Sequence, residues 1–317
     1  MSFSWAINII KHMESLNYYL KRSRDNGQAI GHFNFATGDV LRAIINGAKE
    51  AGAEAVMVGT SEAEADFLNL KVAVAMVMAM RIEFEFPVFL NADHFKSFEK
   101  CKEAIDAGYD SVIIDASRLE FKNNIELTKR VVDYAKSVNM GITVEGELGY
   151  LRGSSQIQQK IVISRDDYTR PEQAIEFVHT TGIDRLAVVF GNIHGIVTEQ
   201  EEKLDIEYFK QINATMPDVY YVLHGASGLK DEEIVSAIKA GIANVHFNTE
   251  LRVAYKQSID AAIHEKPSES APYQYLAQAD DEVKKIVIAK TKLFMGVWPL
   301  ILMGLYVIIP ELFYKTL

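Results

Sequence analysis

The sequence predicts an α/β fold in which eight strand–helix units close into a (β/α)8 TIM barrel, with an extra N-terminal helix and additional C-terminal helices. Short apolar runs alternate with amphipathic stretches along most of the 317 residues. Strict alternation of strands and helices is typical of a parallel sheet, and eight units match a closed barrel. No glycine-rich dinucleotide fingerprint follows the first predicted strand, which disfavours the rival fold, an open doubly wound sheet.

Eight segments have the pattern of strands in the wall of such a barrel. A strand buried on both faces reads as a continuous apolar run, and each of these segments ends in small or polar residues. The predicted strands are Ala29–Phe35, Ala55–Thr60, Val88–His94, Ser111–Ser117, Gly141–Gly149, Arg185–Gly195, Val219–Gly228 and Ile242–Glu250.

The stretches between the strands predict helices from their apolar spacing and their end signals. An amphipathic helix is expected at Trp5–Arg24, and a long helix with an apolar run at Val72–Met80, which we expect to be packed in the core, ends near Phe84. A polar loop at Tyr150–Tyr168 precedes a helix whose start carries a predicted capping box, Thr169 to Glu172. The other predicted helices span residues 37–52, 97–108, 123–139, 231–241 and 251–263.

The bulk composition excludes several classes of function. The formal net charge is −10, and no basic stripe is present, which argues against a nucleic-acid partner. Cys101 is the only cysteine, so an internal disulfide is impossible and a reducing compartment, the cytoplasm, is expected. We expect one domain over residues 1–292, followed by an atypical hydrophobic tail at residues 293–317.

Histidines and carboxylates gather at the predicted strand ends, which is where an α/β barrel carries its chemistry. The apolar run of the third strand ends abruptly in Asp93 and His94. Three imidazoles with an open position form a catalytic zinc arrangement, and strand-end carboxylates can add ligands or move protons. The strand-end histidines are His32, His94, His194, His224 and His246, and the carboxylates are Asp93, Asp115, Glu145 and Glu147.

The last two strands end in HGASG and HFNTE, where small residues expose backbone N–H groups and Ser227 and Thr249 add hydroxyls. The loops after strands seven and eight of a barrel often hold a phosphate. No predicted strand end carries a lysine, so a Schiff-base mechanism is not expected. Carbanion chemistry at this site would then need a metal as electron sink.

Six motifs in register, GHFNF, NADH followed by KS, VEGELG, GNIHG, HGASG and NTELR, resemble the class II, metal-dependent fructose-1,6-bisphosphate aldolases over roughly Tyr19 to Phe294. The resemblance implies a catalytic Zn²⁺, sugar-phosphate substrates and a homodimer or larger homo-oligomer. It implies that His94, His194 and His224 bind zinc, and that Asp93 exchanges a proton with the C4 hydroxyl. Asp115 and Glu147 match carboxylates of a second divalent cation site.

The remaining matches concern substrate binding, and a monovalent cation is a further candidate at the phosphate loops. The matched positions are Asn34, Ser61, Gly195, Gly225, Ala226, Ser227, His246, Asn248 and Thr249.

Two departures from the family pattern stand out. Many relatives place acidic residues after strand five, one of which moves the C1 proton, whereas this chain reads RGSSQIQQ, leaving Glu145 and a water as substitutes. Many relatives also have asparagine at position 246 and aspartate at position 248.

The implied reaction is reversible cleavage of fructose 1,6-bisphosphate to dihydroxyacetone phosphate and glyceraldehyde 3-phosphate. The nearest alternative is tagatose 1,6-bisphosphate or another ketose phosphate. A non-catalytic sugar-phosphate-binding barrel is the alternative from a different class of protein, and the missing loop carboxylates favour it.

The tail is unusual, because about 18 residues from Leu293 to Pro310 carry no charge, which reaches the lower length of a membrane-spanning helix. Against a span, Pro299 lies inside the segment and would kink a helix. Three interpretations stay open: a tail that associates with a membrane, an apolar segment packed on the barrel or a partner subunit, and an altered reading frame.

Overall fold

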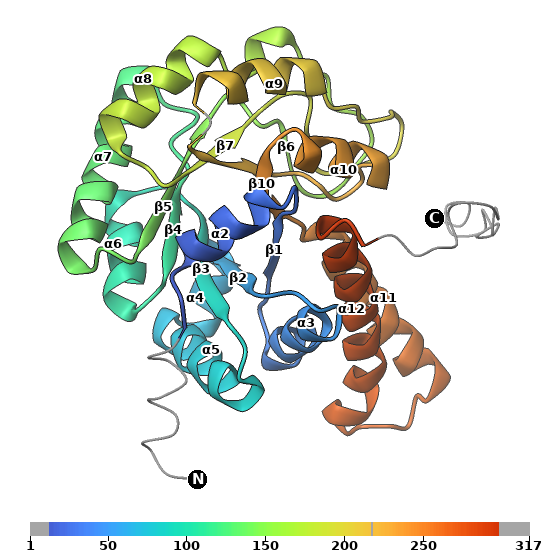
Figure 1. The fold of residues 1–317 in the computed structure, drawn as a ribbon. Helices are drawn as coiled ribbons and strands as arrows, with labels where there is room; N and C mark the ends of the chain where they lie inside the picture. The colour runs from blue at the N-terminus through green and yellow to red at the C-terminus, as the bar shows by residue number, and fades with distance from the viewer. Residues whose placement is uncertain (1–12, 217, 298–317) are drawn as a thin grey trace.

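The computed structural model describes residues 13–216 and 218–297 and contains a closed barrel of parallel strands (Figure 1). Each strand pairs with its sequence neighbour in the wall, and β1 closes the barrel on β10. The predicted (β/α)8 barrel is therefore confirmed. Its strands are β1 (Ile30–Asn34), β2 (Val56–Ser61), β3 (Val88–Phe95), β4 (Ser111–Ile114), β5 (Thr143–Leu148), β7 (Arg185–Val188), β9 (Tyr220–Leu223) and β10 (Ile242–His246).

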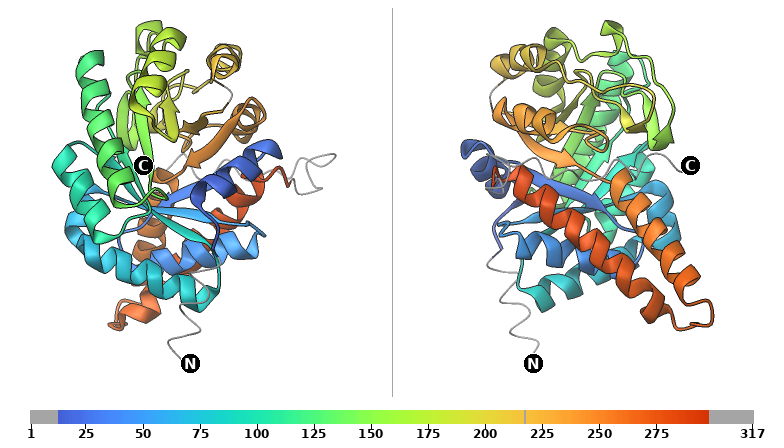
Figure 2. Two further views of the ribbon diagram at one scale, coloured as in Figure 1. Left: turned by 60° about the vertical axis from the view of Figure 1, so that its left-hand side comes forward. Right: turned by 90° about the vertical axis from the view of Figure 1, so that its right-hand side faces the viewer.

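Helices surround the barrel on its outside, as the two turned views show (Figure 2). Alternate strand residues such as Val58, Leu90 and Val144 pack outward against these helices and form the main hydrophobic core. The helices are α3 (Gly38–Glu50), α4 (Glu62–Leu68), α5 (Leu70–Phe84), α6 (Phe98–Ala107), α7 (Phe121–Val138), α8 (Pro171–Thr181), α9 (Ile206–Thr215), α10 (Asp231–Lys239) and α11 (Thr249–Glu265).

The amino end of the barrel is closed by α2 (Leu16–Asp25), which crosses it (Figure 1). Leu16 and Leu20 are buried there in a separate cluster with Ile30, Met57 and Phe89 from the first residues of three strands. The other end of the barrel, where the strands finish, remains available for a site. The helix begins later than predicted, and the first part of the predicted segment lies outside the described residues.

The C-terminal helices α11 and α12 (Pro272–Phe294) form an antiparallel pair on one side of the barrel (Figure 2). Gly47 of α3 allows α12 to approach closely, because a Cβ there would lie 2.9 Å from Cβ of Val287. Leu293 and Phe294, the first residues of the predicted tail, are buried at the end of α12. Residues 298–317 lie outside the described part, and among the described helices none has the length and apolar character needed to cross a bilayer.

Three local predictions were wrong. The long helix is two helices, α4 and α5, because Asn69 between them has a left-handed backbone with φ of 72°, and its apolar run is only partly buried, with Val72 46% exposed. The polar loop contains β6 (Gly153–Gln158) and a 3-10 turn, Arg165–Asp167. Thr169 does not cap α8, because its hydroxyl donates to the carbonyl of Leu148 in the barrel wall.

Candidate active site

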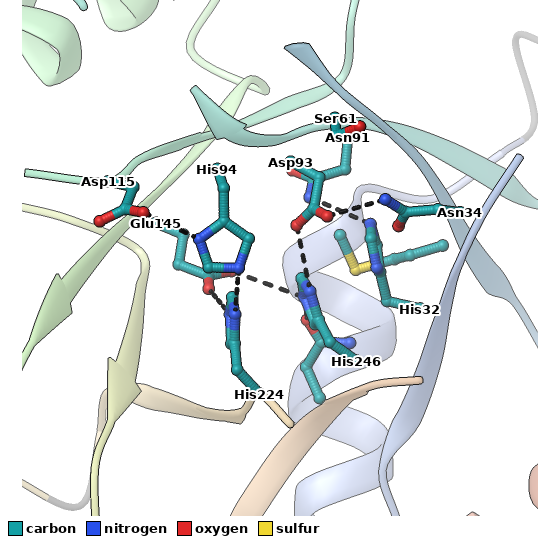
Figure 3. Close-up of polar contacts among 12 residues, drawn as sticks. His32, Asn34, Ser61, Asn91, Asp93, His94, Asp115, Glu145, His224 and His246 are labelled. Carbon is teal, nitrogen blue, oxygen red and sulfur yellow. Dashed lines mark hydrogen bonds and ion pairs between the residues drawn. The ribbon is translucent and has the colours of Figure 1, made fainter. Parts of the chain in front are cut away.

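Asp93 and His94 both point into a cavity at the carboxyl end of the barrel, although neighbouring residues of a regular strand point to opposite faces. His94 has a left-handed φ of 53°, and the pairing of β3 with β4 shifts register between Ala92 and Phe95. This irregularity turns the strand so that the carboxylate and the imidazole share one face. Figure 3 shows the two side chains side by side.

The cavity collects nearly all of the predicted site residues. Asp115 and Glu147 line an adjoining cavity instead, which shares His94 and His194 with the first. Among the described residues 13–216 and 218–297, no lysine lines the first cavity. Its lining residues are Asn34, Ser61, Asp93, His94, Ser155, His194, Gly195, His224, Gly225, Ala226, Ser227, His246, Asn248, Thr249 and Arg252.

Two predicted zinc ligands face each other at the base of the cavity. Nδ1 of His224 lies 2.8 Å from Nε2 of His94, and a carboxylate oxygen of Glu147 joins them in a group of potential ligand atoms within 4.8 Å of one another. The ring centroid of His194 lies 5.2 Å from that of His94, but His194 is not part of that group. Two imidazoles and a carboxylate are ligands that suit a divalent metal such as Zn²⁺.

Carboxylates surround the other side of the His94 ring. Nδ1 of His94 lies 3.2 Å from Asp115 Oδ2 and 3.5 Å from Glu147 Oε2. Burial opposes charging of His94, but Asp93, Asp115 and Glu147 outweigh it and raise its pKa to about 10. Burial and the charge of Asp115 raise the pKa of Glu147 to about 7. The negative potential at this point therefore attracts a cation.

A second layer of charge fixes the orientation of His224. Nε2 of His224 lies 2.7 Å from Glu145 Oε1, and Glu145 Oε2 lies 2.8 Å from Nη1 of the fully buried Arg185. Glu145 is ionised beside the guanidinium, so Nε2 of His224 carries the hydrogen and Nδ1 is left with a free electron pair. That free pair points to His94, where a metal would bind.

Replacing Glu145 with glutamine is expected to weaken zinc binding by about 10- to 100-fold, the range known for such outer ligands. The amide no longer enforces the Nε2–H form of His224 and no longer neutralises Arg185. The measurement is competition for zinc with a chelating dye, together with the melting temperature. Glu99→Gln on the exposed face of α6 is the matched control. An unchanged zinc affinity in the Glu145 variant would remove this role.

His246 stands between two other imidazoles. Its ring is stacked on His32 at 3.8 Å and on His224 at 4.2 Å between centroids. Nδ1 of His246 faces Asp93 Oδ1 at 3.4 Å, as Figure 3 shows. His246 also belongs to two further groups of potential metal ligands, one with His32 and Asp93 and one with Glu145 and His224.

Backbone donors dominate the end of the cavity near β9 and β10. Gly225 has φ of 70°, and a Cβ there would lie 2.0 Å from the carbonyl oxygen of Ile193, so only glycine fits this turn. Helix α11 begins at Thr249, and its N-cap, Asn248, makes no side-chain cap bond. The N–H of Glu250 in this first turn donates to the Ser227 hydroxyl at 3.4 Å, and the amino end of the helix suits an anion such as phosphate.

The segment after β5 folds over the same end. β6 pairs with β8 (His194–Val197). His194 therefore lies on a short separate strand, whereas the sequence predicted that it would lie at the end of the strand that begins at Arg185. The hydroxyls of Ser155 and Thr249 lie 3.0 Å apart. The segment brings no carboxylate to the cavity, and the two oxygens of Glu145 contact His224 and Arg185.

Sequence reasoning missed four residues of this region. Arg185 opens an apolar strand, and that unusual position is the one signal that could have revealed it. Glu64 lies outside the cavity lining and accepts hydrogen bonds from Asn34 and Ser61. Ser155 and Arg252 line the cavity from β6 and the first turn of α11, where their residue types carry no distinctive pattern.

Comparison with known proteins agrees with this geometry. A family model described as fructose-bisphosphate aldolase class II matches residues 14–297. Fructose-bisphosphate aldolases of Staphylococcus epidermidis and of Staphylococcus aureus are each 34% identical to the chain over 283 residues, which cover 88% of this chain and 96% of theirs.

Solved structures give the same result. The YdjI aldolase from Escherichia coli superposes with a TM-score of 0.75 at 33% identity, covering 88% of this chain and 96% of that one. A putative fructose-1,6-bisphosphate aldolase from Coccidioides immitis has a TM-score of 0.75 at 24% identity, covering 89% of this chain and 96% of that one, which supports the fold alone. Because the family model spans most of the chain and close relatives agree with it, the chain belongs to the class II fructose-bisphosphate aldolase family.

Proposed function

We propose that the protein catalyses reversible, zinc-dependent aldol cleavage of fructose 1,6-bisphosphate to dihydroxyacetone phosphate and glyceraldehyde 3-phosphate. The observation that carries the proposal is that one cavity holds the Asp93 carboxylate together with His94 and His224, whose ring nitrogens face each other. Backbone N–H groups near β9 and β10, which suit a phosphate group, add support. Relatives named for this activity also support it.

The residues fit a metal ion. Oε2 of Glu147 is buried without a hydrogen-bond partner, and His94 and His224 present ring nitrogens beside it. We propose that His94, His194 and His224 hold Zn²⁺, that Asp115 and Glu147 serve a second divalent cation, and that a monovalent cation binds at the phosphate loops. When bound, a metal of this kind stabilises the negative charge that develops on the substrate carbonyl.

Asp93 is proposed as the catalytic base that takes the proton from the C4 hydroxyl while the C3–C4 bond breaks. Its Oδ2 accepts a hydrogen bond from the amide of Asn34 at 2.8 Å, and Oδ1, which has no hydrogen-bond partner and faces Nδ1 of His246 at 3.4 Å, is proposed to face the substrate. Gly195, Gly225, Ala226, Ser227, Asn248 and Thr249 are proposed to hold the phosphate of the ketone half, with Arg252 as the nearby cation.

We propose a cytoplasmic homodimer or larger homo-oligomer, from the cysteine content and the family. Tagatose 1,6-bisphosphate is the second candidate substrate, because it differs only in configuration at C4 and the same side chains face that carbon.

Treatment with a chelator is expected to abolish cleavage of fructose 1,6-bisphosphate, and added zinc is expected to restore it. The measurement couples product formation to reduction of dihydroxyacetone phosphate, and the metal content is determined in the same samples. Activity that survives complete metal removal would refute the metal-dependent mechanism. Stoichiometric zinc without cleavage of either bisphosphate would point to another ketose phosphate as the substrate, whereas protein with neither zinc nor activity would favour a non-catalytic sugar-phosphate-binding barrel.

A further inference from the structure

One carboxylate oxygen binds three hydrogens at the β1–β2 end of the cavity. Oε2 of Glu64 accepts from the backbone N–H of Ser61 at 2.8 Å, from the Ser61 hydroxyl at 2.9 Å and from Nδ2 of Asn34 at 3.1 Å. Glu64 thereby forms a capping box with Ser61 at the start of α4. It does not line the cavity itself, but it controls two residues that do.

Counting hydrogens shows what Asn34 and Ser61 can offer to a substrate. The Ser61 hydroxyl has a single hydrogen, which goes to Glu64. The amide nitrogen of Asn34 has two, of which one goes to Asp93 at 2.8 Å and the other to Glu64. Both side chains therefore present only acceptor oxygens, which match a donating hydroxyl group and offer nothing to a phosphate, itself an acceptor.

Charge points in the same direction. Glu64 and Asp93 share Asn34 as a donor, so two carboxylates lie at this end of the cavity, Asp93 in its lining and Glu64 behind it. Burial raises the pKa of Glu64, and the hydrogen bonds that it accepts from Ser61 and Asn34 oppose that shift and favour the ionised form. Arg252, the guanidinium that lines the cavity within the described ranges, lies on α11 and contacts Ser155, at the end proposed for the ketone phosphate. A second phosphate at Ser61 would meet like charge without a donor.

We propose that Glu64 is a specificity-determining residue that makes this end of the cavity bind substrate hydroxyls and disfavour a second phosphate. The inference rests on the proposed aldol cleavage and changes only the ranking of its substrates. The preferred substrate class is then a ketose 1-phosphate whose far end carries hydroxyl groups, ahead of a ketose bisphosphate.

The test compares kcat/KM for fructose 1-phosphate and fructose 1,6-bisphosphate in zinc-loaded protein. The unmodified protein is expected to favour the monophosphate. Glu64→Gln keeps the length of the side chain, removes its charge and supplies an N–H, so it is expected to shift the ratio at least tenfold toward the bisphosphate. Glu64→Ala frees the hydrogens of Ser61 and Asn34 and is expected to shift the ratio in the same direction.

Asp66→Asn, an exposed carboxylate on the same helix, is the matched control and should leave the ratio unchanged. Melting temperatures and zinc content separate a specificity effect from lost folding. A wild-type preference for the bisphosphate, or a ratio that Glu64→Gln does not move, overturns the inference. If neither sugar is cleaved, the proposed function fails, and calorimetric affinities of the two sugars for wild type and Glu64→Gln still decide the inference by the same ratio.

Discussion

Replacing His224 with alanine is expected to remove bound zinc and aldolase activity together. Its Nδ1 faces His94 Nε2 at 2.8 Å, and its side chain is held in place by Glu145 from below. The unprotonated nitrogen of this buried imidazole faces a second proposed ligand, which is the arrangement that binding of a metal ion requires. Lewis-acid stabilisation contributes several kcal/mol, so the expected loss in kcat is roughly 10³-fold or more.

The measurement is zinc per polypeptide by mass spectrometry, alongside the cleavage rate. His179→Ala, which removes an exposed histidine of α8, is the matched control and should retain both. His194→Ala is expected to behave like the His224 variant, although its ring lies farther from the facing pair. A histidine variant that keeps stoichiometric zinc removes that residue from the proposed ligands.

The barrel and its site were predictable because local patterns and global fold agree. Apolar runs such as Val88–Leu90 are buried on both faces, and the polar residues that end them mark the rim of the sheet. Barrel closure then brings together strand ends that lie far apart in the chain. Asn34, Asp93 and His224 come from β1, from β3 and from the residue directly after β9, yet they line one cavity.

The rest depends on contacts between distant segments, which residue patterns do not carry. The left-handed backbone of His94 is imposed by the shifted pairing of β3 with β4. β6 looked like a polar loop because its residues are largely exposed, and only its pairing with β8 defines it as a strand. Arg185 acts through Glu145, and Glu64 acts through Asn34, partners that lie far away in the sequence. Only the unusual place of Arg185 at the start of an apolar run indicates such a role.

Replacing Asp93 with alanine is expected to leave zinc bound while kcat falls by about 10²- to 10⁴-fold, the usual contribution of a general base. Burial opposes its charge, but the neighbouring His94 and His246 hold the pKa of Asp93 well below its ordinary value, so the carboxylate is ionised at neutral pH, as a base must be. Asp133→Ala on the exposed side of α7 is the matched control. Turnover near the wild-type rate would refute the role of base. Loss of zinc with activity would instead make Asp93 a metal ligand or a support for His94. Zinc content and cleavage rate, measured separately, therefore distinguish the role of Asp93 from that of His94, although the irregular strand β3 places both side chains on the same face.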